Sequence, residues 1–173
     1  MDDRLRKQCL YLEYLSDVDD QTNNQYKKSL KERVEHLESF LSTPNIYWLD
    51  LFYKDSPDPV GFVVYGKENM CHPDADIMIY DAFVKHEFRR KGVMTRAFDT
   101  LCKDKRVCMF INNANTCARK FWVGLMLRRL YGSINLKRTR SEERMNKLGF
   151  SLYCFEHRPD LYAKKPTNVE VTL

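Results

Sequence analysis

This sequence of 173 residues lacks the features that define several classes of protein. It has no run near the roughly 18 consecutive apolar residues that a membrane-spanning helix needs, and its first residues show no apolar segment with a small-residue cleavage site. Its six cysteines are widely scattered and form no CxxC pair, and Cys71 beside His72 is too small a cluster for a metal site. We therefore expect a soluble, cytoplasmic protein with reduced thiols and no metal.

Internal repeats and low-complexity linkers are absent from the sequence as well. Hydrophobic residues make up 43% of the chain and aromatic residues 13%, which is too rich a composition for a disordered protein. A chain of this length buries a core without help from disulfides or structural metals. We expect one domain over residues 1–173, with a tail from about residue 164.

Charge is divided unevenly along the chain. Residues 1–81 contain 9 Lys and Arg against 16 Asp and Glu, a balance of −7, whereas residues 82–173 contain 20 against 8, a balance of +12. This polarity suggests that the second half meets an anion, either a phosphorylated cofactor or nucleic acid, and that the acidic half faces a cationic substrate. The alternative is that both sets of charges are solvated surface.

Hydrophobic periodicity predicts a chain of mixed strands and helices. Runs rich in β-branched and aromatic residues predict strands at residues 5–15, 46–53, 61–65, 77–84, 107–111, 134–137 and 150–156. Apolar residues at spacings of three and four predict helices at residues 26–44, 93–101, 116–131 and 141–148. Residues 17–24 are expected to form a polar turn, residues 56–59 the turn of a hairpin, and Gly149 a helix C-cap.

The segment at residues 84–95 is the most specific part of the sequence. A predicted strand leads there into a cationic turn with one glycine, and a helix follows. The unpaired backbone N–H groups and the positive end of the helix dipole at such a turn bind phosphate or pyrophosphate. Gly92 allows close approach of the backbone, and Arg89, Arg90 and Lys91 add positive charge. The alternative is an ordinary solvated basic turn.

This segment resembles the acetyl-CoA signature of the GNAT N-acetyltransferase superfamily. In that signature a strand ending in Val is followed by Arg/Gln-x-x-Gly-x-Gly/Ala. Val84, Arg89 and Gly92 match it, and Met94 stands where the family has its third small residue.

A second stretch carries the same resemblance. Residues 115–122 are similar to the family's second motif, Asn-x-x-Ala-x-x-Phe-Tyr, with Trp122 in place of the tyrosine. Residues 147–150 (Lys-Leu-Gly-Phe) are similar to its closing element. Residues 123–146 intervene as an insertion before the closing strand, and this insertion offers a surface for a homodimer.

The resemblance implies an α/β (α+β) fold. Its central sheet is mixed, mostly antiparallel and flanked by helices, with splayed fourth and fifth strands. It also implies direct transfer of the acetyl group of acetyl-CoA to a primary amine of a small molecule or protein. The residues that would bind the cofactor, acetyl-CoA, are then Ala82, Phe83, Val84, Arg89, Arg90, Lys91, Gly92, Val93, Met94, Thr95, Asn115, Ala118, Phe121 and Trp122.

Two further residues are candidates for proton transfer. The attacking amine must lose a proton, and Asp81, at the end of a predicted strand, is our candidate general base. The alternative role for Asp81 is a hydrogen bond from a neighbouring backbone N–H. The family's second motif supplies a tyrosine to protonate the leaving thiolate, but the indole of Trp122 is not an acid at neutral pH. We expect Tyr131 or water to replace it.

The sequence leaves two other functions open. The amine could be carried on RNA, such as aminoacyl-tRNA, docked by a basic surface formed by Arg119, Lys120, Arg128, Arg129, Lys137, Arg138, Arg140, Arg144 and Lys147. Met94 and Trp122 leave room for a catalytically silent module that binds acetyl-CoA. The sequence does not identify the amine, because acceptor pockets are built from variable loops.

Overall fold

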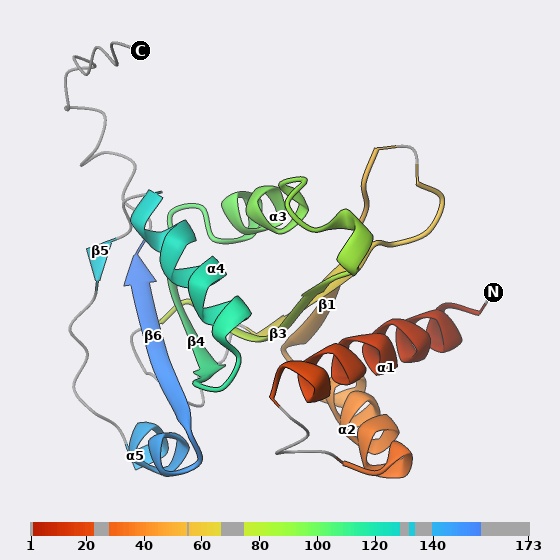
Figure 1. Ribbon diagram of the computed structural model, residues 1–173, viewed down its shortest axis with the longest axis horizontal. Coiled ribbons are helices and arrows are strands. Elements are labelled where there is room, and N and C mark those ends of the chain that lie inside the picture. The colour runs from red at the N-terminus through yellow and green to blue at the C-terminus, as the bar shows by residue number, and fades with distance from the viewer. Residues whose placement is uncertain are drawn as a thin grey trace.

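The computed structural model describes residues 2–22, 28–54, 56–66, 75–128, 132–133 and 140–156. In this part of the chain a six-stranded sheet has the order β1-β2-β3-β4-β6-β5 (Figure 1). The strands are β1 (Ile46–Leu51), β2 (Gly61–Gly66), β3 (Ile77–Val84), β4 (Arg106–Asn112), β5 (Gly132–Ser133) and β6 (Phe150–Glu156). The helices are α1 (Asp3–Gln21), α2 (Leu30–Ser42), the 3-10 helix η1 (His86–Phe88), α3 (Val93–Leu101), α4 (Thr116–Arg128) and α5 (Arg140–Lys147).

The sheet opens between its two central strands. Neighbouring strands are antiparallel except β3 and β4, which are parallel. These two strands pair from Ile77–Val107 to Ile79–Met109, and within the described residues their pairing goes no further. Their C-terminal ends therefore diverge. The mixed, mostly antiparallel sheet with one splayed pair confirms the expected fold class.

A β-bulge in β3 coincides with this divergence. Val64 of β2 pairs with Asp81, and the next residue, Tyr65, pairs with Ile79, so Tyr80 is an extra residue in β3. Side chains alternate between the two faces of a strand, and one extra residue reverses the alternation. Ile79 packs in the core with α3 and α4, whereas Asp81, two residues later, lies against α1 on the opposite face.

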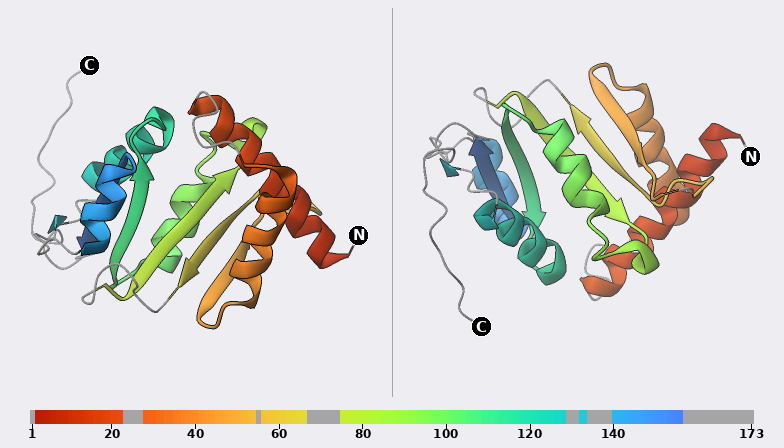
Figure 2. Two further views of the ribbon diagram at one scale, coloured as in Figure 1. Left: turned by 90° about the horizontal axis from the view of Figure 1, so that it is seen from below. Right: turned by 90° about the horizontal axis from the view of Figure 1, so that it is seen from above.

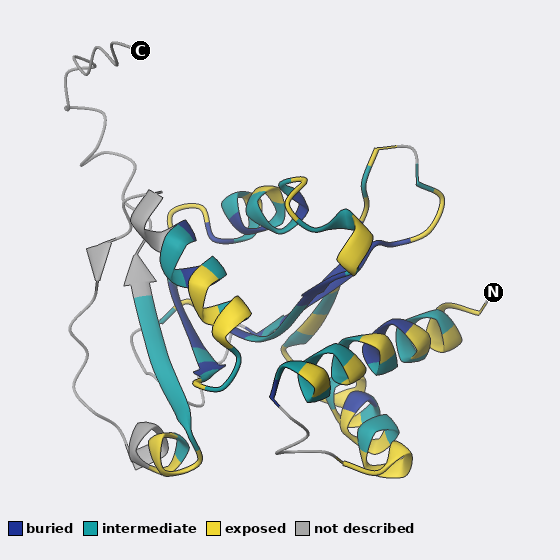
Figure 3. Ribbon diagram, viewed as in Figure 1, coloured by how far each residue is buried: buried dark blue, intermediate teal, exposed yellow. Residues whose placement is uncertain are grey.

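Helices cover both faces of the sheet (Figure 2). On one face, Leu10 and Tyr11 of α1 and Leu37 of α2 pack with Phe62 and Phe83 of the strands. Strands β2, β3 and β4 are mostly buried, while the outer sides of α1 and α2 are exposed (Figure 3). This amphipathic division stabilises both helices mainly through the apolar area that they bury on the sheet.

The opposite face carries α3 and α4. Val93 and Phe98 of α3 and Trp122 and Leu125 of α4 belong to one buried cluster with residues of β2, β3 and β4. Because α3 follows β3 and α4 follows β4, the N-termini of both helices lie next to the diverging strand ends. The layers thus bring the two sequence motifs together.

The predicted strand at residues 5–15 is wrong, because this segment belongs to α1. Leu10, Tyr11, Tyr14 and Leu15 recur at helical spacing and pack against the sheet with α2. The predicted polar turn at residues 17–24 is wrong in its first half, since α1 continues to Gln21. The splayed pair expected as the fourth and fifth strands is therefore β3 and β4.

The other predicted elements agree with the structure where it describes them. Strands β1, β2, β3, β4 and β6 and helices α2, α3, α4 and α5 lie at the predicted places, and Gly149 has the positive φ of 79° expected after a helix. The strand predicted at residues 134–137 and the tail from residue 164 lie outside the described residues. Within the described ranges, no helix has both the length and the apolar character needed to cross a bilayer.

Candidate active site

Two adjoining cavities occupy the gap between the diverging strands. The larger cavity, of about 500 Å³, lies between the end of β3, the turn before α3, and the start of α4. The smaller cavity, of about 260 Å³, lies between α1, α2 and the facing parts of β3 and β4. They share a wall formed by Tyr14, Val18, Ala82, Asn115, Ala118 and Trp122.

The larger cavity collects the predicted cofactor-binding residues, which come from β3, the turn and α4. Of the fourteen residues in that set, those that line the cavity are Ala82, Phe83, Val84, Arg89, Arg90, Gly92, Val93, Met94, Thr95, Asn115, Ala118, Phe121 and Trp122. Lys91 is the exception. Its ammonium lies over the rings of Tyr53 and Phe88, 5.4 and 5.2 Å from their centroids.

The turn before α3 has the backbone of an anion-binding nest. Arg90 and Gly92 have φ values of 62° and 77°, in the left-handed region. The first hydrogen bond of α3 runs from the N–H of Arg96 to the carbonyl of Gly92 at 3.0 Å, so the N–H groups of residues 93–95 have no acceptor within the helix. These N–H donors lie at the positive end of the α3 dipole, an arrangement that suits a phosphate.

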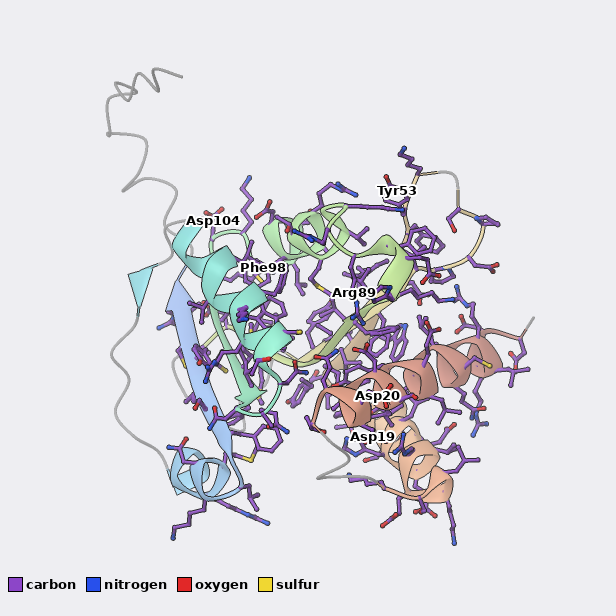
Figure 4. The ribbon with its side chains drawn as sticks, viewed as in Figure 1. Asp19, Asp20, Tyr53, Arg89, Phe98 and Asp104 are labelled. Carbon is purple, nitrogen blue, oxygen red and sulfur yellow. The ribbon has the colours of Figure 1, made fainter. Side chains whose placement is uncertain are left out.

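Arg89 is held in place by two contacts. Its Nε donates to the carbonyl of Val84 at 2.9 Å, and its Nη2 pairs with Asp17 of α1 at 2.9 Å. Figure 4 shows Arg89 between the turn and α1. The guanidinium therefore braces the turn against α1 at the edge of the larger cavity.

Arg96 is a neighbour of the nest that sequence reasoning missed. Its Nη1 donates to the carbonyl of Lys91 at 3.2 Å. A Cβ atom added at Gly92 would lie 3.0 Å from the same nitrogen. The spacing of four residues between Gly92 and Arg96 on the first turn of a helix is the signal that could have found this contact.

Asp81 lies in the wall of the smaller cavity and accepts hydrogen bonds from two tyrosines of α1. Tyr14 donates to Oδ1 at 2.6 Å and Tyr11 to Oδ2 at 3.3 Å. Among the described residues its carboxylate is thus bonded by hydroxyls, not by the neighbouring backbone N–H that was the alternative. Sequence reasoning missed both tyrosines, because a segment predicted as a strand hid their place on α1.

Burial controls protonation in this cluster. It raises the pKa of Asp81, although the hydrogen bonds from Tyr14 and Tyr11 act in the opposite direction. Burial, followed by the charge of Asp81, raises the pKa of both Tyr11 and Tyr14. The tyrosines therefore remain protonated donors at neutral pH, and Asp81 has the raised proton affinity that suits a general base.

The start of α4 closes the other wall. Asn115 Oδ1 accepts the N–H of Ala118 at 2.9 Å, which caps the helix. Trp122 is buried, with the rings of Phe98 and Phe121 at 5.3 and 5.0 Å. It fills the core beneath both cavities. Tyr131, the predicted general acid, lies outside the described residues.

The predicted basic surface for RNA is described only in part. Arg119 and Lys120 on α4 and Arg144 and Lys147 on α5 are exposed. Lys137 and Arg138 lie outside the described residues, as do the side chains of Arg128, Arg129 and Arg140. RNA binding and a homodimer through residues 123–146 stay predictions.

Comparisons with known proteins agree with this geometry. A family model for the acetyltransferase (GNAT) family matches residues 11–124. An acetyltransferase of the GNAT family from Staphylococcus aureus Mu50 is similar with a TM-score of 0.59 at 14% identity, over 91% of this chain and 96% of that one. Among curated proteins, none matches this sequence.

Two further solved structures have the same fold. An acetyltransferase from Thermus thermophilus is similar with a TM-score of 0.58 at 14% identity, over 88% of this chain and 89% of that one. The diaminobutyrate acetyltransferase EctA from Paenibacillus lautus, solved with L-2,4-diaminobutyric acid and coenzyme A, is similar with a TM-score of 0.52 at 12% identity, over 90% and 89%.

Proposed function

Because the chain belongs to the GNAT acetyltransferase family and is therefore an acyltransferase, we propose that it transfers the acetyl group of acetyl-CoA directly to a primary amine. The observation that carries this proposal is the shared wall of the two cavities. One cavity holds an anion-binding turn, the other holds the half-buried carboxylate of Asp81, and the strand ends between them do not pair with each other. Two reactants bound in the two cavities would meet at Ala82.

The larger cavity suits coenzyme A. The N–H groups of residues 93–95, with Arg90 beside them, would bind the diphosphate. The part of β3 from Ala82 to Val84 has backbone groups that no longer pair with β4, and these would bond the pantetheine arm. Acetyl-CoA supplies an activated acetyl group, and the protein contributes position and desolvation.

The smaller cavity suits the amine. The amine nitrogen attacks the thioester carbonyl carbon, a C–N bond forms, the C–S bond breaks, and the thiol of coenzyme A leaves. Asp81 takes the proton that the nitrogen loses, because a carboxylate with two accepted hydrogen bonds still has free lone pairs. Tyr14 and Tyr11 are positioning residues that hold this carboxylate. A proton for the departing thiolate would come from Tyr131 or water, because the buried indole of Trp122 is not an acid.

Two measurements test this function. Calorimetry should detect binding of acetyl-CoA, and a thiol-release assay with a panel of primary amines should give turnover above the rate without enzyme. Binding without turnover for every amine would favour the silent module and contradict the proposal. Absence of binding would remove the role given to the turn.

A further inference from the structure

The smaller cavity has two charged side chains that neutralise each other. Arg33 of α2 and Asp19 of α1 form an ion pair, and their side chains are 11% and 14% exposed. The pair joins the two helices at the cavity wall, with Asp19 near the end of α1 (Figure 4). It contributes little net charge to a ligand inside.

His36 adds little charge as well. Its ring lies against Phe40, with centroids 4.6 Å apart. Burial, followed by the charge on Lys28, lowers the pKa of His36, although Asp81 acts in the opposite direction. A histidine with a pKa below its ordinary value of 6.5 is mostly neutral at pH 7.

One negative and one positive group remain in the cavity wall. The negative group is Asp81, whose carboxylate accepts only from tyrosine hydroxyls among the described residues. The positive group is Lys28, which precedes α2 and is exposed at the cavity rim. Its ammonium has no ion-pair partner among the residues that the structure describes, and residues 23–27 of the sequence contain no acidic side chain.

These two groups belong to one electrostatic site. Both side chains line the same cavity, and the charge of Lys28 lowers the pKa of both Asp81 and His36. A ligand that fills the cavity therefore meets both a carboxylate and an ammonium. The complementary ligand has an amine and an anionic group, since unpaired charges in a cavity are costly.

The size of the cavity limits the ligand further. Its volume of about 260 Å³ lies just below the range of about 300–1,000 Å³ that drug-sized ligands occupy. This volume accommodates a molecule of amino-acid size.

We propose that the acetyl acceptor is a small aminocarboxylate, whose amine lies at Asp81 and whose carboxylate is bound by Lys28. This inference rests on the proposed function, and it names the class of amine that the enzyme takes. A diamine without a carboxylate would leave Lys28 unpaired and bring a second positive charge toward it.

Matched pairs of amines test the inference. Norvaline is compared with 1-aminobutane and ornithine with 1,4-diaminobutane, since each pair differs by one carboxylate. We expect kcat/KM to be higher for the aminocarboxylate by about tenfold or more, the size of one charge-assisted hydrogen bond. Lys28→Ala should remove this preference by raising KM for the aminocarboxylate of each pair. Lys28→Glu should reverse it in favour of 1,4-diaminobutane.

Lys31→Ala is the matched control. Lys31 is the next lysine in the chain; its side chain is 85% exposed beside Glu35, and it lines neither cavity. This variant should keep the preference of the unsubstituted enzyme.

The outcomes separate the two proposals. Turnover with no amine would overturn the proposed function itself. Three results would overturn only the inference about the acceptor. They are equal turnover of the two amines in each pair, a preference for the aminocarboxylate that persists in Lys28→Ala, and fastest turnover with a lysine-containing peptide.

Discussion

We expect cofactor binding to depend most on Gly92. Its φ of 77° is strained for any residue with a Cβ, and its neighbours supply the N–H groups of the nest. A glutamate there would bring a carboxylate into the place of the phosphate. We expect Gly92→Glu to weaken acetyl-CoA binding by about tenfold or more, as measured by calorimetry, because about 1.4 kcal/mol corresponds to a factor of 10.

Gly149→Glu is the control for backbone strain. Gly149 has a similar φ of 79° but lines neither cavity. Both variants should lose stability, by roughly 1–2 kcal/mol per strained residue, whereas only Gly92→Glu should lose affinity. Equal affinity in the two variants would show that the nest does not bind the cofactor.

Asp81 offers a pH-dependent test of its environment. Burial raises the pKa of the Asp81 carboxyl in the folded protein above its ordinary value of 3.8. At a pH between the ordinary pKa and the raised one, the folded protein therefore binds more protons than the unfolded chain. Stability therefore falls as pH rises through this window. Asp81→Asn lacks this loss and should melt at a higher temperature than the unsubstituted protein at pH 7, with the difference vanishing below pH 3.8. Asp58→Asn, in an exposed turn, should show no such trend.

The same variant tests catalysis. Removal of a general base lowers rates by about 10²–10⁴-fold, and kcat/KM of Asp81→Asn should fall in that range while acetyl-CoA affinity is kept. A stable variant with full activity would assign the proton transfer to another group.

In the proposed reaction Tyr14 would act through Asp81. Its hydrogen bond of 2.6 Å lowers the pKa of the carboxyl, so Tyr14→Phe should raise that pKa. The acidic limb of the kcat/KM profile should move to higher pH, while the rate above that limb is largely kept. Tyr47→Phe, on the exposed edge strand β1, should leave the profile in place, and a uniform loss of rate in Tyr14→Phe would contradict a positioning role.

Among the elements, α1 links the two cavities. Tyr14 bonds Asp81, and Asp17, almost one turn later, pairs with Arg89 at the other cavity. Both contacts depend on the helical spacing of three residues. The segments predicted as a strand and as a polar turn thus form one helix that contacts both cavities.

Helix α2 begins with a capping box that supports the proposed acceptor pocket. Ser29 Oγ accepts the N–H of Glu32 at 3.3 Å, and Glu32 accepts the N–H of Ser29 at 2.8 Å. Ser29→Ala should lower the free energy of unfolding by about 1 kcal/mol, as measured by urea denaturation. Ser39→Ala on the exposed side of the same helix should change it by much less, and equal effects would argue against the cap.

Strand β3 shows how one residue sets the direction of a functional side chain. Without the bulge, regular alternation would place Asp81 on the same face as Ile79, in the core with α3 and α4. The bulge brings the carboxylate to α1 and also ends the pairing with β4. Bulges are frequent next to active sites for this reason.

At the scale of the whole molecule, the cavities lie between the acidic and the basic parts of the chain. The first 81 residues have a balance of −7 and form α1, α2 and the strands as far as Asp81, whereas the remainder has +12. The turn that suits an anion belongs to the basic part. A cofactor with several phosphates would be attracted to that side.

Ligand binding should stabilise the whole molecule. A ligand at about 100 times its Kd adds about 2.7 kcal/mol to the free energy of unfolding, which corresponds to a rise in Tm of several degrees for domains of this size range. Differential scanning fluorimetry with coenzyme A should show such a rise in the unsubstituted protein and in Gly149→Glu. A shift of the same size in Gly92→Glu would place the cofactor elsewhere.

The sequence by itself determined the local parts of this site. Val84, Gly92 and the start of α3 follow one another in the chain, so their geometry depends on local backbone preferences that a short motif records. The helix start at Asn115 is local in the same way. These segments could be predicted from the sequence, and with them the residues that β3, the turn and Asn115 place in the wall of the larger cavity, but not those that α1 adds to it, Tyr14, Asp17, Val18 and Gln21.

Only the tertiary structure decided what lies opposite them. The hydrophobic pattern of residues 5–15 is compatible with the period of a strand and with that of a helix. Packing against the sheet selects the helix. Tyr14 is 67 residues from Asp81 in the sequence, so their contact could not be predicted from neighbouring residues. The face of β3 on which Asp81 lies could not be predicted either, because it depends on how β2 pairs with the bulge in β3. Contacts between distant segments form only when the whole sheet and its helices pack together.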